Sequence, residues 1–456
     1  MEVSSAKFLS HLASVIPMIA DANFVVIDLE MSGINPPSAP RVAKPTMEEV
    51  YHRAREATKT FRMLQFGLTC IMQDEKEGVK MVSHNYHVSP MFNERWDKGA
   101  ESLARMVDRT LSISYDTLLF LKKNSLRIED AYSDGINYLG RAEEAAILPN
   151  FLTLQTGQGR DTVGLENADA ETKAFYESVR DKIKRWEDSK DSRLVYQILD
   201  DEFPGRYRAF ARYNTFMQIC HKDDEEEAET IKKRETALAV QRGLRYIIEA
   251  LVGGDFASGI EMARRTEHTT ADNDNDCFKS AERKLKHSRP VLVGHNMFLD
   301  LCFLYATFFA PLPETLDVFR RKISELFPRV IDTKYIVTLN EHDMMPAMNL
   351  EDLYKKAECD GCSGIFSLFN PNGMKAHTGK HHAGHDSYMT AVVFCKEMKE
   401  QLRGGAGDSG KTTRQTDGEL SKMLMEWDTD TCAELSNKIR IGNSGILDLN
   451  GRAQSL

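Results

Sequence analysis

The sequence lacks any apolar run long enough to cross a membrane, and it is poor in cysteine. Its longest apolar stretches, such as Leu301–Ala310 and Val15–Ala20, fall short of the ~20 residues that a spanning helix needs. Eight cysteines scattered over 456 residues do not make a disulfide framework, which favours a reducing compartment. We therefore expect a soluble protein with no membrane partner, cytoplasmic and/or nuclear.

The chain also lacks a surplus of basic residues. Its formal net charge of −10 argues against a histone-like protein coated in positive charge. It does not exclude an enzyme whose nucleic-acid groove is locally basic, because net charge says little about local potential. A cluster of acidic metal ligands would itself contribute to the deficit.

A signal peptide is not the best interpretation of the N-terminal run LSHLASVIPMIA, because an apolar strand, FVVIDLE, begins a few residues later. The spacing of Phe8, Leu12, Val15 and Ile19 predicts an amphipathic helix instead.

The organisation of the chain is that of an α/β protein with a charged interruption. FVVIDLE and MLQFGLTCIMQ read as strands, whereas 170–235 is highly charged and helical, as in a solvated helix face or connector. We expect a loop over Phe256–Lys279, which contains TTADNDND, and a flexible segment at GGAGDSGKTTRQTDGE.

The segment FVVIDLEMSGI carries the first informative pair of acids. Its apolar run predicts a strand buried on both faces, and the alternation of side chains places Asp28 and Glu30 on the same face. Two neighbouring carboxylates repel each other unless a cation lies between them, and Mg²⁺ prefers such oxygen ligands. An Asp-x-Glu pair also arises by chance in many chains of this length.

Two further segments each carry an aspartate next to a turn. PVLVGHNMFLDLCFLY predicts a buried strand, a turn and an apolar helix with Asp300, which is costly to bury without a partner. KHHAGHDSYMTAVVF places Asp386 at the start of an apolar helix, five residues after His381. Taken singly, Asp300 could be satisfied by backbone or arginine, and Asp386 could be a helix cap.

Together, the three segments resemble the DEDD exonucleases that use a His-x-x-x-x-Asp third motif, and in detail the poly(A)-specific ribonuclease family. The resembling stretches are FVVIDLEMSGI, LQFGL, DGINYL, LVYQIL, GHNMFLD, FPRVIDTK and HHAGHD, with a looser match at NKIRIGNSGILDLNG. They cover nearly the whole chain.

The resemblance implies an α/β fold with a ribonuclease-H-like exonuclease core and a smaller α/β insert. The discontinuous nuclease domain would comprise 1–165 and 240–400, and the insert 170–235 would be of a type that binds single-stranded nucleic acid. Residues 403–456 would hold a flexible segment and complete the nuclease, with no RNA-recognition domain.

The implied activity is 3′-to-5′ hydrolysis of single-stranded RNA, poly(A) above all, by a homodimer that releases 5′-AMP. Asp28, Glu30, Asp300 and Asp386 would bind two Mg²⁺ ions, or Mn²⁺ in their place, and His381 would be the general base. The positions matching the family's substrate contacts are Met31, Ile34, Phe120 and Lys334.

The chain departs from the family in two places. Met31 stands where relatives carry an aromatic residue, which weakens the expected stacking of a terminal base. The charged region contains no Arg-x-x-x-His, the motif through which such inserts bind single strands, so an RNA-binding role for 170–235 is in doubt.

Three alternatives remain. Cys359, Cys362, His377 and His381 fit a zinc pattern, although the 14 residues between the pairs exceed the usual ~12 and zinc would remove His381 from catalysis. An RNA-binding scaffold with a decayed nuclease would typically have lost a carboxylate, and all four are present. Trimming the 3′ ends of small or non-coding RNAs is the alternative substrate assignment.

Overall fold

The computed structural model describes residues 1–36, 42–74, 78–92, 100–107, 109–123, 127–153, 170–189, 207–212, 216–221, 224–267, 272–339, 349–359, 366–368, 382–404, 434–442, 444–451 and 454–455. The chain divides into two compact units, Met1–Ile147 with Ala237–Leu456, and Leu148–Thr236. We call them the sheet unit and the inserted unit.

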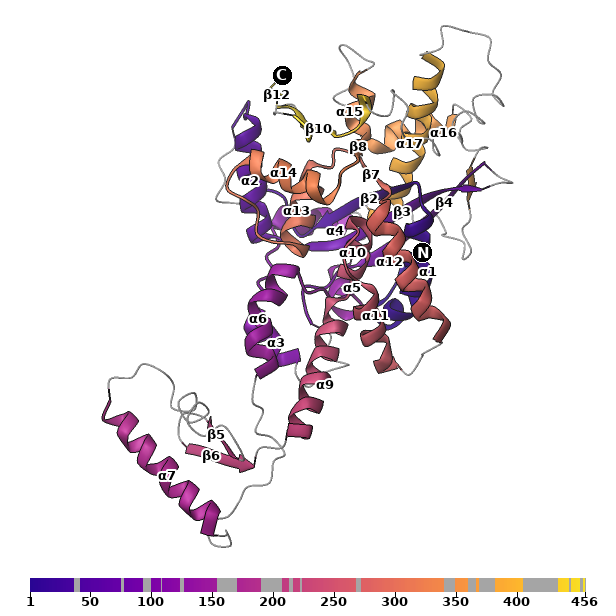
Figure 1. Cartoon of the computed structure of the whole chain (residues 1–456). Helices are drawn as coiled ribbons and strands as arrows, with labels where there is room; N and C mark the ends of the chain where they lie inside the picture. Colours follow the sequence, from indigo (N-terminus) through magenta and orange to yellow (C-terminus); the bar gives the residue numbers. More distant parts are fainter. Residues whose placement is uncertain are drawn as a thin grey trace. The chain divides into compact units, whose positions relative to one another are not determined.

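A seven-stranded sheet forms the centre of the sheet unit (Figure 1). Its strand order is β1-β4-β3-β2-β7-β8, and β9 pairs with the far end of β4. Strands β2, β3 and β4 are antiparallel, whereas β2, β7 and β8 are parallel. The bounds are β1 (Glu2–Val3), β2 (Phe24–Met31), β3 (Met63–Asp74), β4 (Gly78–His87), β7 (Val291–Gly294), β8 (Val330–Asp332) and β9 (Phe366–Leu368).

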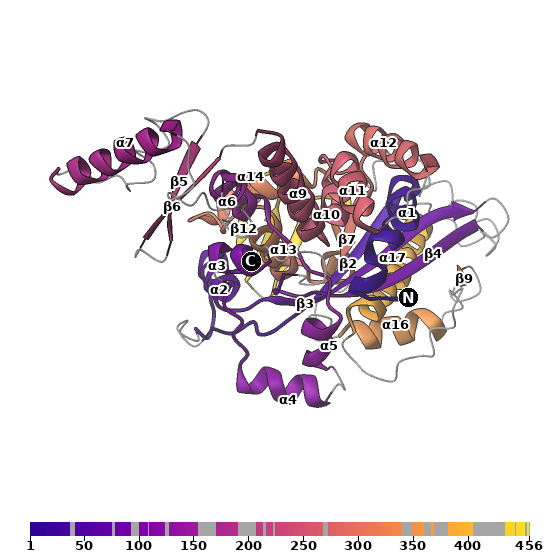
Figure 2. The ribbon, with the colours of Figure 1, turned by 90° about the horizontal axis from the view of Figure 1, so that it is seen from below.

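Helices cover both faces of this sheet. Phe24 and Val26 pack in one core with helix α17 (Ala383–Gly404), whereas Val25 and Ile27 pack in a second core with helix α1 (Ser5–Asp21). The alternation explains the unbroken apolar run at the start of β2. Figure 2 shows α1 beside α11 (Ala257–Arg264) and α12 (Asp272–His287).

The remaining helices of the sheet unit are α2 (Met47–Thr60), α3 (Ala100–Val107), α4 (Tyr115–Lys123), α5 (Ile128–Ser133), α10 (Arg245–Val252), α13 (Phe298–Phe308), α14 (Leu316–Leu326), α15 (Thr333–Leu339) and α16 (Leu350–Cys359). A C-terminal sheet consists of β10 (Lys438–Ile441), β11 (Gly445–Asp448) and β12 (Gln454–Ser455). The amphipathic helix predicted near the N-terminus is confirmed, because α1 buries Phe8, Leu12, Val15 and Ile19.

One predicted loop is wrong. Within Phe256–Lys279, the structure has α11, a 3-10 turn at Arg265–Glu267 and the start of α12. Helix α12 begins at Asp272. Phe278, Ala281 and Leu285 are then buried at helical spacing, and this short apolar stripe is hidden in the sequence by the polar run before it.

The inserted unit contains α7 (Ala170–Glu187) and a hairpin of β5 (Tyr207–Arg212) and β6 (Phe216–His221). Helix α6 (Arg141–Thr153) leads out of the sheet unit, and α9 (Asp224–Arg242) leads back into it. No helix in the described part of the chain is both long enough and apolar enough to span a membrane.

Candidate active site

The first two candidate ligands lie at the end of β2. Strand β7 pairs with Phe24, Val25 and Val26 only, so Asp28 and Glu30 project beyond the end of that pairing. They alternate in phase with Phe24 and Val26, and therefore lie on the face that α17 covers. The register with β3 shifts between Glu30 and Met31, which ends the regular ladder at the site.

Asp300 approaches the same region from α13. After β7 the chain turns through Asn296, whose φ of 55° lies in the left-handed region that asparagine tolerates better than most residues. Helix α13 then begins, with Asp300 in its first turn. The backbone N–H of Leu29, which lies between the two β2 acids, donates a hydrogen bond to the Asp300 carboxylate and ties α13 to β2.

Asp386 is placed by the start of α17, which approaches β3 and β4 very closely. Gly67 permits this approach, because a Cβ there would lie 1.9 Å from the carbonyl oxygen of Ala383. The Thr69 hydroxyl is 2.8 Å from that of Ser387, and both are buried. The predicted position of Asp386 in the first turn of an apolar helix is confirmed.

These elements bring the acids together. Ligand oxygens of Asp28, Glu30 and Asp386 lie within 4.8 Å of one another. Burial raises the pKa of Asp28 and of Glu30 well above their usual values, and the neighbouring acids, Asp300 included, raise them further. Burial also raises the pKa of Asp300 and of Asp386 to about 7. Such a set of oxygen donors fits a hard divalent cation.

Asp332 supports this site, and the sequence did not single it out. It is fully buried at the end of β8. Its Oδ1 accepts hydrogen bonds from the backbone N–H groups of Asn296 (2.7 Å) and Lys334 (3.0 Å), and its Oδ2 from Arg440 (3.0 Å). One carboxylate thus joins the turn before α13, the start of α15 and strand β10. The sequence feature that could have indicated Asp332 is its position at the end of the short apolar strand VID.

Comparison with known proteins identifies the family to which this chain belongs. The model of the CAF1 family ribonucleases matches residues 3–394. The chain belongs to this family. The ribonuclease-H-like α/β core expected from the sequence is therefore confirmed.

Several characterised relatives of this CAF1-family chain are similar over most of its length. The Xenopus laevis poly(A)-specific ribonuclease PARN is 24% identical over 430 residues, and the Homo sapiens PARN is 25% identical over 433. A Bombyx mori pre-piRNA 3′-exonuclease trimmer is 22% identical, over 87% of this chain and 70% of its own length. The match covers 86% of this chain but only 62% and 61% of the two PARN proteins, so the chain spans about three fifths of their length.

Among solved structures, that of S. pombe Pop2p in its Mg²⁺- and Mn²⁺-bound form matches with 13% identity and a TM-score of 0.41. The match covers 90% of this chain and 95% of Pop2p.

The predicted substrate contacts of this CAF1-family chain differ in exposure. Ile34 is 50% exposed just after β2, whereas Met31 packs partly against the core. Lys334 is half-buried in α15. Its pKa is lowered, mainly by burial and to a smaller extent by the nearby positive charge of Arg440. Phe120 belongs to α4, but its side chain lies outside the described residues, so the alternative that it is a core residue stays open.

The predicted base, His381, also lies outside the described residues, as do Cys362, His377 and the side chain of Cys359. The zinc alternative therefore stays untested. The two other histidines of the cluster are described. His382 Nε2 lies 2.6 Å from Glu2 Oε1, and the ring of His385 lies edge-on to that of Tyr354 at 6.3 Å.

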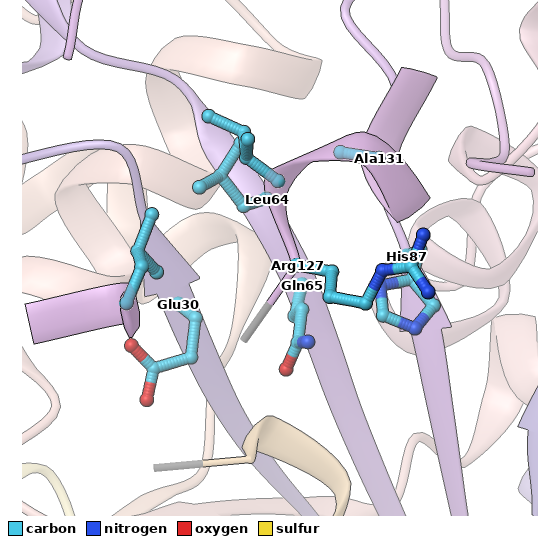
Figure 3. Close-up of a pocket in the computed structure, with 8 residues that line it drawn as sticks. Glu30, Leu64, Gln65, His87, Arg127 and Ala131 are labelled. Carbon is cyan, nitrogen blue, oxygen red and sulfur yellow. The ribbon is translucent and has the colours of Figure 1, made fainter. Parts of the chain in front are cut away.

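A pocket opens beside Glu30 (Figure 3). Its apolar wall comes from β3, α4 and α5, and its polar groups include the Gln65 amide, which lies between Glu30 and His87 in the figure. The pocket therefore adjoins the acid cluster on the side of β3 and β4. The lining residues are Glu30, Leu64, Gln65, His87, Leu121, Arg127, Ile128 and Ala131.

Proposed function

We propose that this chain is a metal-dependent 3′-to-5′ exoribonuclease that degrades single-stranded RNA from a 3′-hydroxyl end, with poly(A) tails as its main substrate and 5′-AMP as its product. The observation that carries the proposal is the convergence of Asp28, Glu30 and Asp386 within 4.8 Å, with Asp300 beside them. Membership of the CAF1 ribonuclease family and similarity to proteins named poly(A)-specific ribonucleases support it.

The four carboxylates would hold two Mg²⁺ ions, or Mn²⁺ in their place. When bound, such ions activate the attacking water and stabilise the leaving oxygen. His381 accepts the proton of that water, which requires its neutral form. Lys334 holds a phosphate group, and Ile34 and Phe120, with a smaller contribution from Met31, present apolar surface to the bases.

The test is a time course on 5′-labelled RNAs of one sequence that end in A, C, G or U, with Mg²⁺ present. We expect a ladder that shortens one nucleotide at a time from the 3′ end, fastest on the adenylate end. A matched RNA with a 3′-phosphate is the control and should stay intact. Internal cleavage, or equal loss of the blocked RNA, would contradict the proposal.

The alternative substrate is the 3′ end of small or non-coding RNAs. The Bombyx mori relative, named as a pre-piRNA 3′-exonuclease trimmer, favours it. Under this alternative the same time course proceeds at similar rates on all four ends. A rate ratio that favours adenylate ends supports deadenylation.

We also propose that the protein is a homodimer in the cytoplasm and/or nucleus. Tyr115, Leu118 and Leu119 on α4 are exposed, and a second copy would cover such apolar groups. Cys70 and Cys302 are buried as free thiols, as suits a reducing compartment. Sedimentation equilibrium tests the dimer, and imaging of the tagged protein tests the location. The domain limits predicted from the sequence, and any binding of RNA by 170–235, stay predictions.

A further inference from the structure

A carboxylate at the edge of the sheet reaches the start of α17. Strand β1 pairs in parallel with β4, and places Glu2 opposite Asn85. The Glu2 side chain lies 2.6 Å from His382 Nε2 and 3.3 Å from His87 Nε2. The Asn85 amide group also donates to it, at 3.1 and 3.3 Å. Glu2 is therefore held from three sides.

The start of α17 is fixed by side chains from three adjacent strands. Glu2 on β1 holds His382. Gln65 on β3 accepts a hydrogen bond from the backbone N–H of Ala383 (3.2 Å). Asn85 on β4 accepts one from Gly384 (3.0 Å). Asn85 also donates to Glu2, which joins the contacts from β1 and β4, and Gln65 on β3 adds a third contact at the neighbouring residue.

These contacts set the position of Asp386, which follows. The carbonyl of His382 accepts hydrogen bonds from the backbone N–H groups of Asp386 (2.8 Å) and His385 (2.7 Å). The His382 side chain is only 12% exposed. Displacing His382 would therefore displace the first turn of α17, and with it Asp386.

The charge of Glu2 suits this role. Burial alone would raise its pKa, but hydrogen bonds from His382 and His87 outweigh burial, so the pKa is lowered below its usual value. Glu2 is therefore ionised at neutral pH and remains a strong acceptor. Among the described residues, the acidic cluster consists of Asp28, Glu30 and Asp386 and does not include Glu2. Glu2 therefore acts on the site indirectly, through His382.

We propose that Glu2 is a positioning residue for the nuclease site, which through His382 fixes the start of α17 and thereby Asp386. This inference rests on the proposed function. It adds to the site a β1 residue that acts on Asp386 indirectly, through His382. Outer partners of metal ligands typically change metal affinity or activity about 10- to 100-fold when they are removed.

The test is a double-variant cycle with Glu2→Ala, His382→Ala and the combination of the two. For each protein, kcat and KM on RNA, Mn²⁺ affinity by calorimetry and the melting temperature are measured. We expect Glu2→Ala to lower kcat or Mn²⁺ affinity about 10-fold or more, with little change in KM. Adding Glu2→Ala to His382→Ala should then have no further effect.

Two further variants separate positioning from simple folding. Glu2→Gln keeps an acceptor oxygen for His382 and should restore most of the loss. Asp21→Ala is the matched control, because it removes an exposed acid that pairs with Lys284 (2.7 Å) and should leave kcat unchanged. If Glu2→Ala fails to fold, Glu2→Asp, whose shorter side chain withdraws the carboxylate from His382, takes its place in the cycle and should show the same coupling to His382→Ala.

Two results would overturn the inference: unchanged kcat and Mn²⁺ affinity in Glu2→Ala, or independent, multiplying effects in the combined variant. If the wild-type protein does not degrade RNA, the proposed function fails by itself. The calorimetric cycle then still decides whether Glu2 positions Asp386.

Discussion

The sheet unit contains two groups of buried or half-buried carboxylates with opposite surroundings. Glu144 lies between Arg242 and Arg245, with Nη–Oε distances of 2.6 Å to each, and Glu249 is bound by Arg141 and Arg245. Burial alone would raise the pKa of Glu144, but the two arginines outweigh it and the pKa is lowered. We call this group the arginine-paired cluster.

The acids at the end of β2 have the reverse pattern. Burial raises the pKa of Asp28, and the neighbouring charges that shift it most are acidic and raise it further. The fold thus pairs the first group with its own arginines, whereas the described charges that most affect Asp28 and Glu30 are other acids. This difference helps to locate functional sites. Acids that are paired with arginines inside the fold are structural, whereas acids that lie close to one another require a bound cation to be ionised together.

The sharpest way to break this comparison is to neutralise single acids without changing their shape. We expect Asp28→Asn, Glu30→Gln, Asp300→Asn or Asp386→Asn each to lower hydrolysis of RNA about 10³-fold or more, since a bound metal supplies several kcal/mol. The Glu144→Gln protein is the matched control, and its folded fraction should remain active. Near-normal activity of any site variant at saturating Mg²⁺ would show that the ligand set is misassigned.

The same contrast applies to the histidines near Asp386. His381→Asn should lower turnover about 10²- to 10⁴-fold, as loss of a general base does, while RNA and Mg²⁺ still bind. His385→Asn is the control, because its ring packs on Tyr354. Loss of bound zinc from the His381→Asn protein would support the zinc alternative, and full activity would exclude His381 as the base.

Fold stability should show the opposite order from activity: the larger loss is expected in the arginine-paired cluster, not in the acids at the end of β2. Glu144→Gln removes the buried charge that pairs with Arg242 and Arg245, although Arg245 keeps Glu249, and we expect it to lower the free energy of unfolding by about 3–5 kcal/mol. Chemical denaturation followed by circular dichroism measures this. A loss of the same size in the metal-free Asp28→Asn protein would erase the distinction between the two clusters.

The pH dependence sharpens the comparison further. Unfolded aspartates ionise near pH ~4, whereas Asp300 and Asp386 have pKa values of about 7 in the folded protein. The folded state therefore binds more protons in this window, and these groups lower the free energy of unfolding as pH rises from ~4 through ~7.

Without metal, Asp300→Asn should melt about 2–4 °C above wild type at pH 8 and show little difference at pH 5. Added Mg²⁺ at pH 8 should stabilise the wild type but not the variant. Parallel melting curves for both proteins across this pH range would contradict the raised pKa values.

The smallest effects should come from the substrate contacts. Phe120→Ala is expected to weaken RNA binding by about 1–3 kcal/mol, and Lys334→Ala to reduce its salt dependence. Ile34→Ala, which removes an exposed apolar group, provides a comparison without loss of charge. A lower melting temperature with unchanged affinity for Phe120→Ala would identify Phe120 as a core residue.

Local patterns predicted the parts of the site that depend on one element. The period of two along β2 placed Asp28 and Glu30 on one face, and the apolar helix after the turn placed Asp300. The partners of Glu2, Glu144 and Asp332 could not be predicted in this way. Each is joined to residues roughly a hundred or more positions away, and no local periodicity records such pairs.

The order in which the site residues occur along the chain has a consequence during synthesis. Asp28 and Asp386 belong to one cluster, yet most of the chain is translated between them. At a translation rate of about 5–20 residues per second, α17 is synthesised on the order of tens of seconds after β2. Until Asp386 is translated, a nascent chain carries Asp28 and Glu30 without their partner from α17, so the acid cluster is incomplete during that time.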